Sequence, residues 1–225
     1  MNLPSKLKFK LNKELDKWTC NSRLFYNANL EDYPDFASGK NLETEDKEAF
    51  NNAFVENFYD KHEKELSNAV EIMNVDWLKI EHEYFKATDK LFKEVQFGGV
   101  YTCYPSIFNR NPRFIDTKEF QAFYKHSSTT NYVCAHEILH FMFYDYIQGN
   151  FKQECGRVGE EGIWKLSEIF NDVVLRLPEF LSITKQANPA INPAETEQEL
   201  ADAAKLWNET KTINAFITKY LASLN

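Results

Sequence analysis

Apolar side chains recur at helical spacing along the first part of the chain. One aromatic face predicts a helix that begins at Thr44 or Glu45. The members of this face are Phe50, Phe54 and Phe58. A second helix is predicted from Ser67 to about Lys93, with an inward face of Val70, Met73, Trp77, Ile80, Tyr84 and Leu91. We therefore expect residues 1–95 to form an N-terminal helical region that packs as part of one domain.

The pattern changes after Gly98 and Gly99, which interrupt the helical spacing. The segments 100–108 and 119–125 are rich in β-branched and aromatic residues, so both are predicted to be strands. The second of them alternates along EFQAFYK. It is expected to be either a sheet edge that pairs with an extended substrate or an interior strand of the core.

Helical patterns return after the strands. Residues 127–131 offer several N-cap side chains ahead of an apolar run that ends near Gly149, which predicts a long helix. The glycine-rich segment 149–162 is predicted to be a connecting loop, and a further helix is expected over about 162–177. The proline-rich segment after it is expected to be extended, before a final helical stretch over roughly 194–223.

These elements together predict an α+β fold that is mostly helical and carries a small twisted β-sheet. Residues 96–225 are expected to form the core of the protein together with a C-terminal helix. A chain of 225 residues is long enough to bury a substantial hydrophobic core.

Composition and charge exclude some function classes. The formal net charge of −8 disfavours binding to nucleic acid, because a phosphate backbone calls for a basic surface. No segment approaches the roughly 20 apolar residues of a membrane span, and the N-terminal residues contain no signal-peptide core. The 4 cysteines form no C-x-x-C pair, so we expect reduced thiols and a cytoplasmic location. A monomer is the default expectation.

The segment HEILH, from His136 to His140, is an H-E-x-x-H motif. Histidines at this spacing lie on one face of a helix, so their ring nitrogens can converge on one metal ion. Glu137 lies next to the first histidine and is near enough to reach a ligand water. The surrounding run is apolar on almost every side, and buried polar side chains need partners, which a metal would supply. The alternative is two core histidines bonded to backbone, with Glu137 reaching the surface.

A catalytic zinc site needs a third protein ligand. No histidine follows His140, so a downstream ligand must be a carboxylate or a cysteine. Glu168 and Asp172 are like charges four residues apart, which is unfavourable unless a positive charge lies nearby. Zinc bound by Glu168 would supply that charge, with Asp172 holding the free ring nitrogen of a ligand histidine. The alternative is a surface row in which Lys165–Glu168 and Asp172–Arg176 form ordinary salt bridges.

Other residues stay open as the third ligand. Glu160 and Glu161, in the glycine-rich segment, are the next carboxylates to consider. Cys103 precedes the motif, as the ligand cysteine of peptide deformylases does, although its surroundings, YTCYPS, differ from the cysteine motif of that family.

The motif, the glycine-bearing segment and the later E-x-x-x-D of SEIFND resemble the gluzincins, the thermolysin-like branch of the zincin metallopeptidases. The resemblance covers residues 131–177, and the two predicted strands precede this segment as in that family. It implies a zincin-like fold, in which a small sheet lies above the active-site helix.

The resemblance also implies the roles of individual residues. His136, His140 and Glu168 would bind one Zn2+ ion, Glu137 would be the general base, and Asp172 would support a ligand histidine. The expected function is therefore a zinc-dependent metallopeptidase acting on a peptide or protein. The alternatives are a catalytically inactive zincin-like protein with a structural or binding zinc site, and a deformylase-like metal amidase.

The chain departs from the gluzincin pattern in two ways. The gap of 27 residues between His140 and Glu168 is longer than in the thermolysin-like enzymes. The later histidine that stabilises the oxyanion in those enzymes is missing. Candidate substitutes are Tyr144, Tyr146, Arg157, Arg176 and Tyr220. A further alternative is that the tail after Pro178 blocks the cleft and keeps the enzyme latent.

Overall fold

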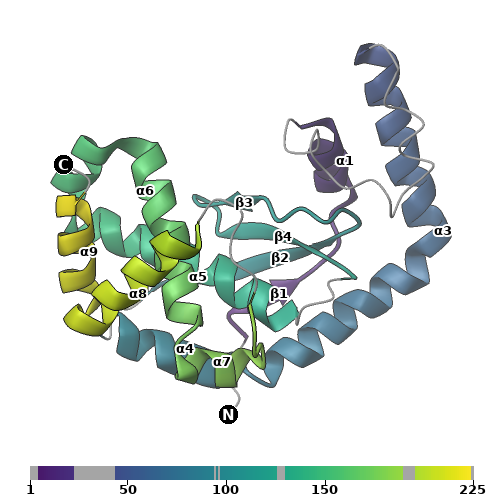
Figure 1. Ribbon diagram of the computed structural model, residues 1–225. Helices are drawn as coiled ribbons and strands as arrows, with labels where there is room; N and C mark the ends of the chain where they lie inside the picture. The colour runs from purple at the N-terminus through teal and green to yellow at the C-terminus, as the bar shows by residue number, and fades with distance from the viewer. Residues whose placement is uncertain are drawn as a thin grey trace. The chain divides into compact units, whose positions relative to one another are not determined.

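Figure 1 shows the computed structural model of the protein, which describes residues 5–22, 44–93, 95, 97–125, 130–189 and 196–223. It is mostly helical with a small mixed sheet, which confirms the predicted α+β class. The chain forms two compact units, and each contains two separate segments. A sheet unit comprises Met1–Trp77 and Val100–Thr130, and a helical unit comprises Leu78–Gly99 and Asn131–Asn225. The zincin-like placement of a sheet above the motif helix stays a prediction.

The sheet has the strand order β1-β2-β4-β3. The two predicted strands form as β2 (Tyr101–Ser106) and β4 (Glu119–Phe123), which pair in parallel. β1 (Leu7–Phe9) extends the sheet in parallel beside β2, and β3 (Arg113–Phe114) pairs antiparallel with β4. Neither was predicted, because strands this short carry too few residues to show alternation. β4 therefore has a neighbouring strand on each side, as the interior-strand alternative required.

Two helices complete the described part of the sheet unit. α1 (Lys13–Asn21) begins at Asn12, whose side-chain oxygen accepts a hydrogen bond from the backbone of Leu15. α3 (Thr44–Leu78) begins where the aromatic face predicted and has non-helical backbone angles at His62. The predicted start of a separate helix at residue 67 is wrong. Neither glycine nor proline lies within Thr44–Leu78, so nothing forces a break at residue 67. The helix predicted over 67–93 is divided between the end of α3 and α4 (Glu81–Leu91).

A buried carboxylate ties α1 to the sheet and to α3. Asp16 accepts hydrogen bonds from the hydroxyls of Tyr59 (2.7 Å) and Ser106 (2.5 Å), from the amide of Gln121 (2.8 Å) and from the backbone of Ile107 (3.3 Å). These donors satisfy both carboxylate oxygens inside the core. Burial nevertheless raises the pKa of Asp16 to about 6, against the opposing effect of the hydrogen bonds.

The helical unit contains the predicted motif helix and the helices around it. They are α4 (Glu81–Leu91), α5 (Thr130–Asn150), α6 (Lys152–Leu175), α7 (Pro178–Thr184), α8 (Glu197–Thr210) and α9 (Ile213–Ser223). The predicted N-cap residues before residue 130 lie outside the described residues. The final helical stretch is divided at Lys211, which has a left-handed backbone conformation.

Two loop predictions in this unit are wrong. The glycine-rich segment is helical, because α5 continues to Asn150 and α6 begins at Lys152. Within α6 the helical backbone is interrupted at Gly159, whose φ of 78° is a conformation that other residues rarely adopt. The segment expected to be extended after Leu177 begins instead with α7, where Pro178 occupies a first-turn position that suits proline. Residues 185–189 of this segment are not helical, and residues 190–195 lie outside the described residues.

The core of the helical unit centres on Phe170 of α6. Its ring lies 5.1 Å from that of Phe143 on α5 and 6.0 Å from that of Phe92, which follows α4. On the other side it lies 6.2 Å from both Trp207 of α8 and Phe216 of α9. Packing of α8 and α9 against α6 therefore fixes the helix that carries Glu168.

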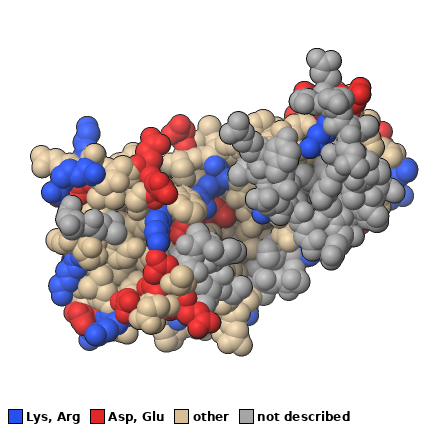
Figure 2. Space-filling model, turned by 45° about the horizontal axis from the view of Figure 1, so that its top comes forward, with Lys and Arg blue, Asp and Glu red and all other residues tan. Residues whose placement is uncertain are grey.

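Charged side chains of both signs lie on the surface of the protein. On the face in Figure 2, lysines and arginines are interspersed with aspartates and glutamates. Across the described ranges, no helix is both long and apolar enough to cross a membrane.

Candidate metal centre

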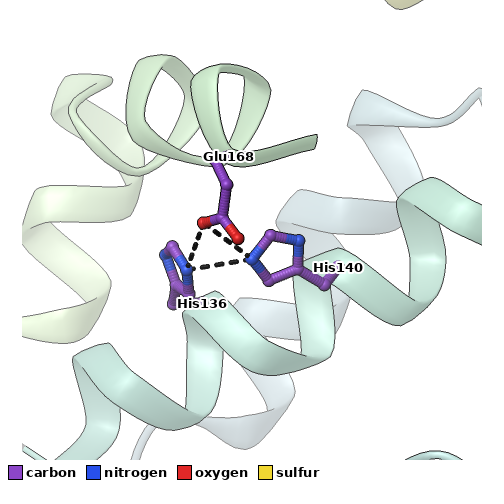
Figure 3. A group of neighbouring side chains, drawn as sticks. All are labelled: His136, His140 and Glu168. Carbon is purple, nitrogen blue, oxygen red and sulfur yellow. Dashed lines mark hydrogen bonds and ion pairs between the residues drawn. The ribbon is translucent and has the colours of Figure 1, made fainter. Parts of the chain in front are cut away.

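α5 and the second half of α6 bring the predicted metal ligands together. α5 is buried on most of its circumference, as its apolar sequence predicted. The predicted apolar stripe of α6 is also buried, and it comprises Ile163, Leu166, Ile169, Phe170, Val173 and Val174. Glu168 lies inside this buried stretch, where it faces the two histidines of α5 (Figure 3).

Three side-chain atoms form a small triangle at this contact. The Nε2 atoms of His136 and His140 are 3.0 Å apart. Oε2 of Glu168 lies 3.4 Å from the first nitrogen and 3.3 Å from the second (Figure 3). In a tetrahedral zinc site with ligand bonds of about 2.0–2.1 Å, neighbouring donors are about 3.3 Å apart. The triangle therefore has the dimensions that one zinc ion requires.

The three side chains of the triangle are largely buried. The side chain of His140 is 0% exposed and that of Glu168 is 4% exposed, whereas that of His136 is 16% exposed. A buried carboxylate beside two imidazoles needs positive charge to offset its desolvation. A divalent cation, or a proton on one of the rings, would provide that charge.

Two hydrogen bonds hold the backbone of α5 at the start of the motif. The hydroxyl of Tyr84, on α4, donates to the backbone oxygen of Ala135 at 2.7 Å. The side-chain amide of Asn171, on α6, donates to the backbone oxygen of His136 at 2.8 Å. Adjacent carbonyls of one helix are thus fixed by side chains from two different helices.

The predicted general base and the supporting aspartate are both buried. Glu137 is 3% exposed and follows the first ligand directly on α5. Asp172 is 2% exposed, and its carboxylate lies 3.7 Å from the guanidinium of Arg176. Glu168 and Asp172 therefore do not lie on the surface, although the Asp172–Arg176 pair of the alternative interpretation forms. Lys165, of the other predicted pair, forms an ion pair with Glu199 of α8.

The candidate oxyanion stabilisers occupy different surroundings. The Tyr146 hydroxyl donates to Oδ1 of Asn214 on α9 at 2.7 Å, which directs this phenol into the helical core. Burial also raises the pKa of Tyr146. The remaining candidates are Tyr144, which is half-buried on α5, Arg157, which is exposed before the bend in α6, Arg176 beside Asp172, and Tyr220, which is half-buried on α9.

The other ligands considered from the sequence do not join the triangle. Glu160 and Glu161 are exposed on α6 directly after Gly159. Cys103 lies in β2, within the sheet unit. Among the described residues, the group able to hold a metal ion comprises His136, His140 and Glu168 and contains no cysteine.

Two neighbours of the site were not predicted. The ring of Tyr132, one turn before the motif, lies 6.5 Å from the imidazole of His136 at an angle of 32°. Asn171 lies three residues after Glu168, and this spacing alone places both side chains on the same face of a helix. The sequence therefore contained a signal for Asn171, whereas the contact with His136 depends on how α6 packs against α5.

Comparisons with protein-family models, with curated proteins and with solved structures found no match. The resemblance to the gluzincins is carried by the HEILH and SEIFND segments. The geometry adds the juxtaposition of His136, His140 and Glu168.

Proposed function

We propose that this protein is a zinc-dependent metallopeptidase whose single Zn2+ ion is held by His136, His140 and Glu168. The observation that carries the proposal is the triangle of donor atoms, with edges of 3.0, 3.4 and 3.3 Å, built on an H-E-x-x-H helix. Two nitrogens and one carboxylate oxygen are the donor set of catalytic zinc sites that leave one position for water.

Glu137 is the residue that distinguishes an enzyme from a structural zinc site. Bound zinc supplies Lewis acidity toward a water molecule and a substrate carbonyl. Glu137 takes the proton of the attacking water and passes it to the departing amine, so its carboxylate serves first as a base and then as an acid. The substrate class is a peptide or protein, and the gluzincin resemblance assigns Asp172 to the support of a ligand histidine.

Paired substitutions test the ligand assignment and the catalytic assignment separately. Glu168→Ala should lower the zinc content of the purified protein from one ion per chain to almost none, because a ligand is removed. Glu137→Gln should keep the zinc and lower hydrolysis of an unfolded protein substrate by about 100- to 10,000-fold, because the proton acceptor is removed. Metal content is measured by atomic emission, and hydrolysis by the release of amino groups.

Glu160→Gln is the matched control, since it removes an exposed glutamate from the same helix as Glu168. It should change neither the zinc content nor the rate. Unchanged zinc in Glu168→Ala would refute the third ligand. If the zinc-loaded wild type cleaves nothing, a structural or partner-binding zinc site becomes the better explanation.

A further inference from the structure

Asn171 is a fully buried amide at the contact between α5 and α6. Its Nδ2 donates to the backbone oxygen of His136 at 2.8 Å. Its Oδ1 is buried and accepts no hydrogen bond from any residue that the structure describes. The side chain therefore makes one hydrogen bond, through Nδ2, and its Oδ1 atom is left without a donor among the described residues.

Packing alone gives no reason for an asparagine at this position. Val174 and Leu175, which follow it on the same face of α6, belong to the hydrophobic core. A buried acceptor without a partner lowers stability, and an apolar side chain of similar size would avoid that loss. A buried residue that lowers stability is often retained because it has a role at a functional site, where function and stable packing favour different residue types.

We propose that Asn171 is a positioning residue that sets the register of α6 against the metal-binding turn of α5. This inference rests on the proposed zinc site. Asn171 and Glu168 share one face of α6. The amide of Asn171 donates a hydrogen bond to the backbone oxygen of His136, the first of the two proposed ligand histidines. A helix advances by about 1.5 Å per residue, so a slip of α6 by one residue would move the Glu168 oxygen away from the two histidine nitrogens, which now lie 3.4 and 3.3 Å from it.

Tyr84 provides a matched control within the same turn of α5. Its hydroxyl donates to the backbone oxygen of Ala135, the residue directly before His136, at 2.7 Å. It comes from α4, which carries none of the three donors. Loss of this hydrogen bond should lower the stability of the protein without changing the position of Glu168.

The experiment compares Asn171→Leu, Asn171→Ala and Tyr84→Phe in the full-length protein. Zn2+ affinity is measured by competition with a chromophoric chelator, and the visible spectrum of the Co2+-loaded protein reports the ligand geometry. Both Asn171 variants should bind Zn2+ about 10- to 100-fold more weakly, as is typical when support of a ligand is removed. Their Co2+ absorption should weaken and shift. Metal-free Asn171→Leu should melt at or above the wild-type temperature.

Tyr84→Phe should show the reverse pattern, with a lower melting temperature and wild-type metal affinity and spectrum. Wild-type affinity and spectrum in both Asn171 variants would overturn the positioning role. So would an equal loss of affinity in Tyr84→Phe, or failure of both Asn171 variants to fold. A wild type that binds the metal but hydrolyses nothing would refute the peptidase proposal and leave this inference standing. A wild type that binds no metal would refute both.

Discussion

Two groups of buried polar side chains in this protein are arranged in different ways. Asp16 accepts hydrogen bonds from four groups, so its carboxylate has partners throughout. In the candidate metal centre, His136, His140 and Glu168 instead direct three donor atoms toward one another. The Asp16 network is complete without a ligand and connects the elements of the sheet unit. The group of His136, His140 and Glu168 is one that a cation would complete, and the proposed zinc chemistry is assigned to it for that reason.

The raised pKa of Asp16 predicts a pH dependence of stability. Because burial raises this pKa from 3.8 to about 6, the folded state holds the proton more tightly than the unfolded chain. The contribution of Asp16 to the free energy of unfolding should therefore fall as the pH rises from about 4 to about 6, by at most about 3 kcal/mol.

Asp16→Asn removes this titration, although it also costs stability because one obligate donor then faces another. Urea unfolding of both proteins, with unfolding of the sheet unit as the signal, gives the free energy of unfolding at each pH between 4 and 7. The slopes of this free energy against pH are then compared between the wild type and the variant. Other carboxyl groups cancel in that difference. Parallel pH profiles for the wild type and the variant would contradict the prediction.

At the scale of elements, α6 links the candidate metal centre to the C-terminal helices. Its bend at Gly159 separates a largely exposed first part from a second part that is buried and carries Glu168. Phe170 packs against Trp207 and Phe216, and Lys165 pairs with Glu199. The helices after Pro178 thus support α6 directly, which favours a structural role for the tail over an inhibitory one.

Truncation after Leu177 tests these two roles. Removal of α7, α8 and α9 exposes the aromatic core around Phe170, and each large side chain lost from such a core typically costs about 3–5 kcal/mol. We expect the shortened chain to lose cooperative unfolding in calorimetry and to bind almost no zinc. Deletion of only Leu224 and Asn225, which follow α9, should leave both properties unchanged. A truncated protein that stays folded and hydrolyses substrate faster would instead support latency.

At the scale of the whole molecule, two units are each assembled from separate segments of the chain. The three candidate ligands all belong to the helical unit, and the Asp16 network belongs to the sheet unit. Ligand binding stabilises the part of a protein that forms the site. The two units should therefore respond differently to metal.

Hydrogen exchange with and without zinc measures this difference. With zinc at about 1,000 times its dissociation constant, the amides of α5 and α6 that exchange only on opening of the site should gain up to about 4 kcal/mol of protection. The amides of β2 and β4 should exchange as before, which makes the sheet an internal control. Equal protection in both units, or none in α5 and α6, would contradict the assignment of the metal to this site.

The local patterns of the sequence were enough for the main elements. Helical spacing predicted α5 and the buried part of α6, and β-branched and aromatic residues predicted β2 and β4. The i, i+4 spacing of His136 and His140 fixes their common face, since it depends only on helix geometry. Glycines were a poor guide, because most of those after α5 lie within helix and only Gly159 takes a conformation that breaks it.

Tertiary packing decided everything that depends on residues far apart in the chain. β1 joins the sheet through pairing with β2, about 90 residues later, so its own three residues carry no signal. The approach of Glu168 to the histidines depends on the bend in α6 and on the aromatic core around Phe170. The sequence by itself determined which side chains could bind a metal. Only the packing of α6 on α5 determined that three of them meet within bonding distance of one point, and that the amide of Asn171 donates a hydrogen bond to the backbone of His136.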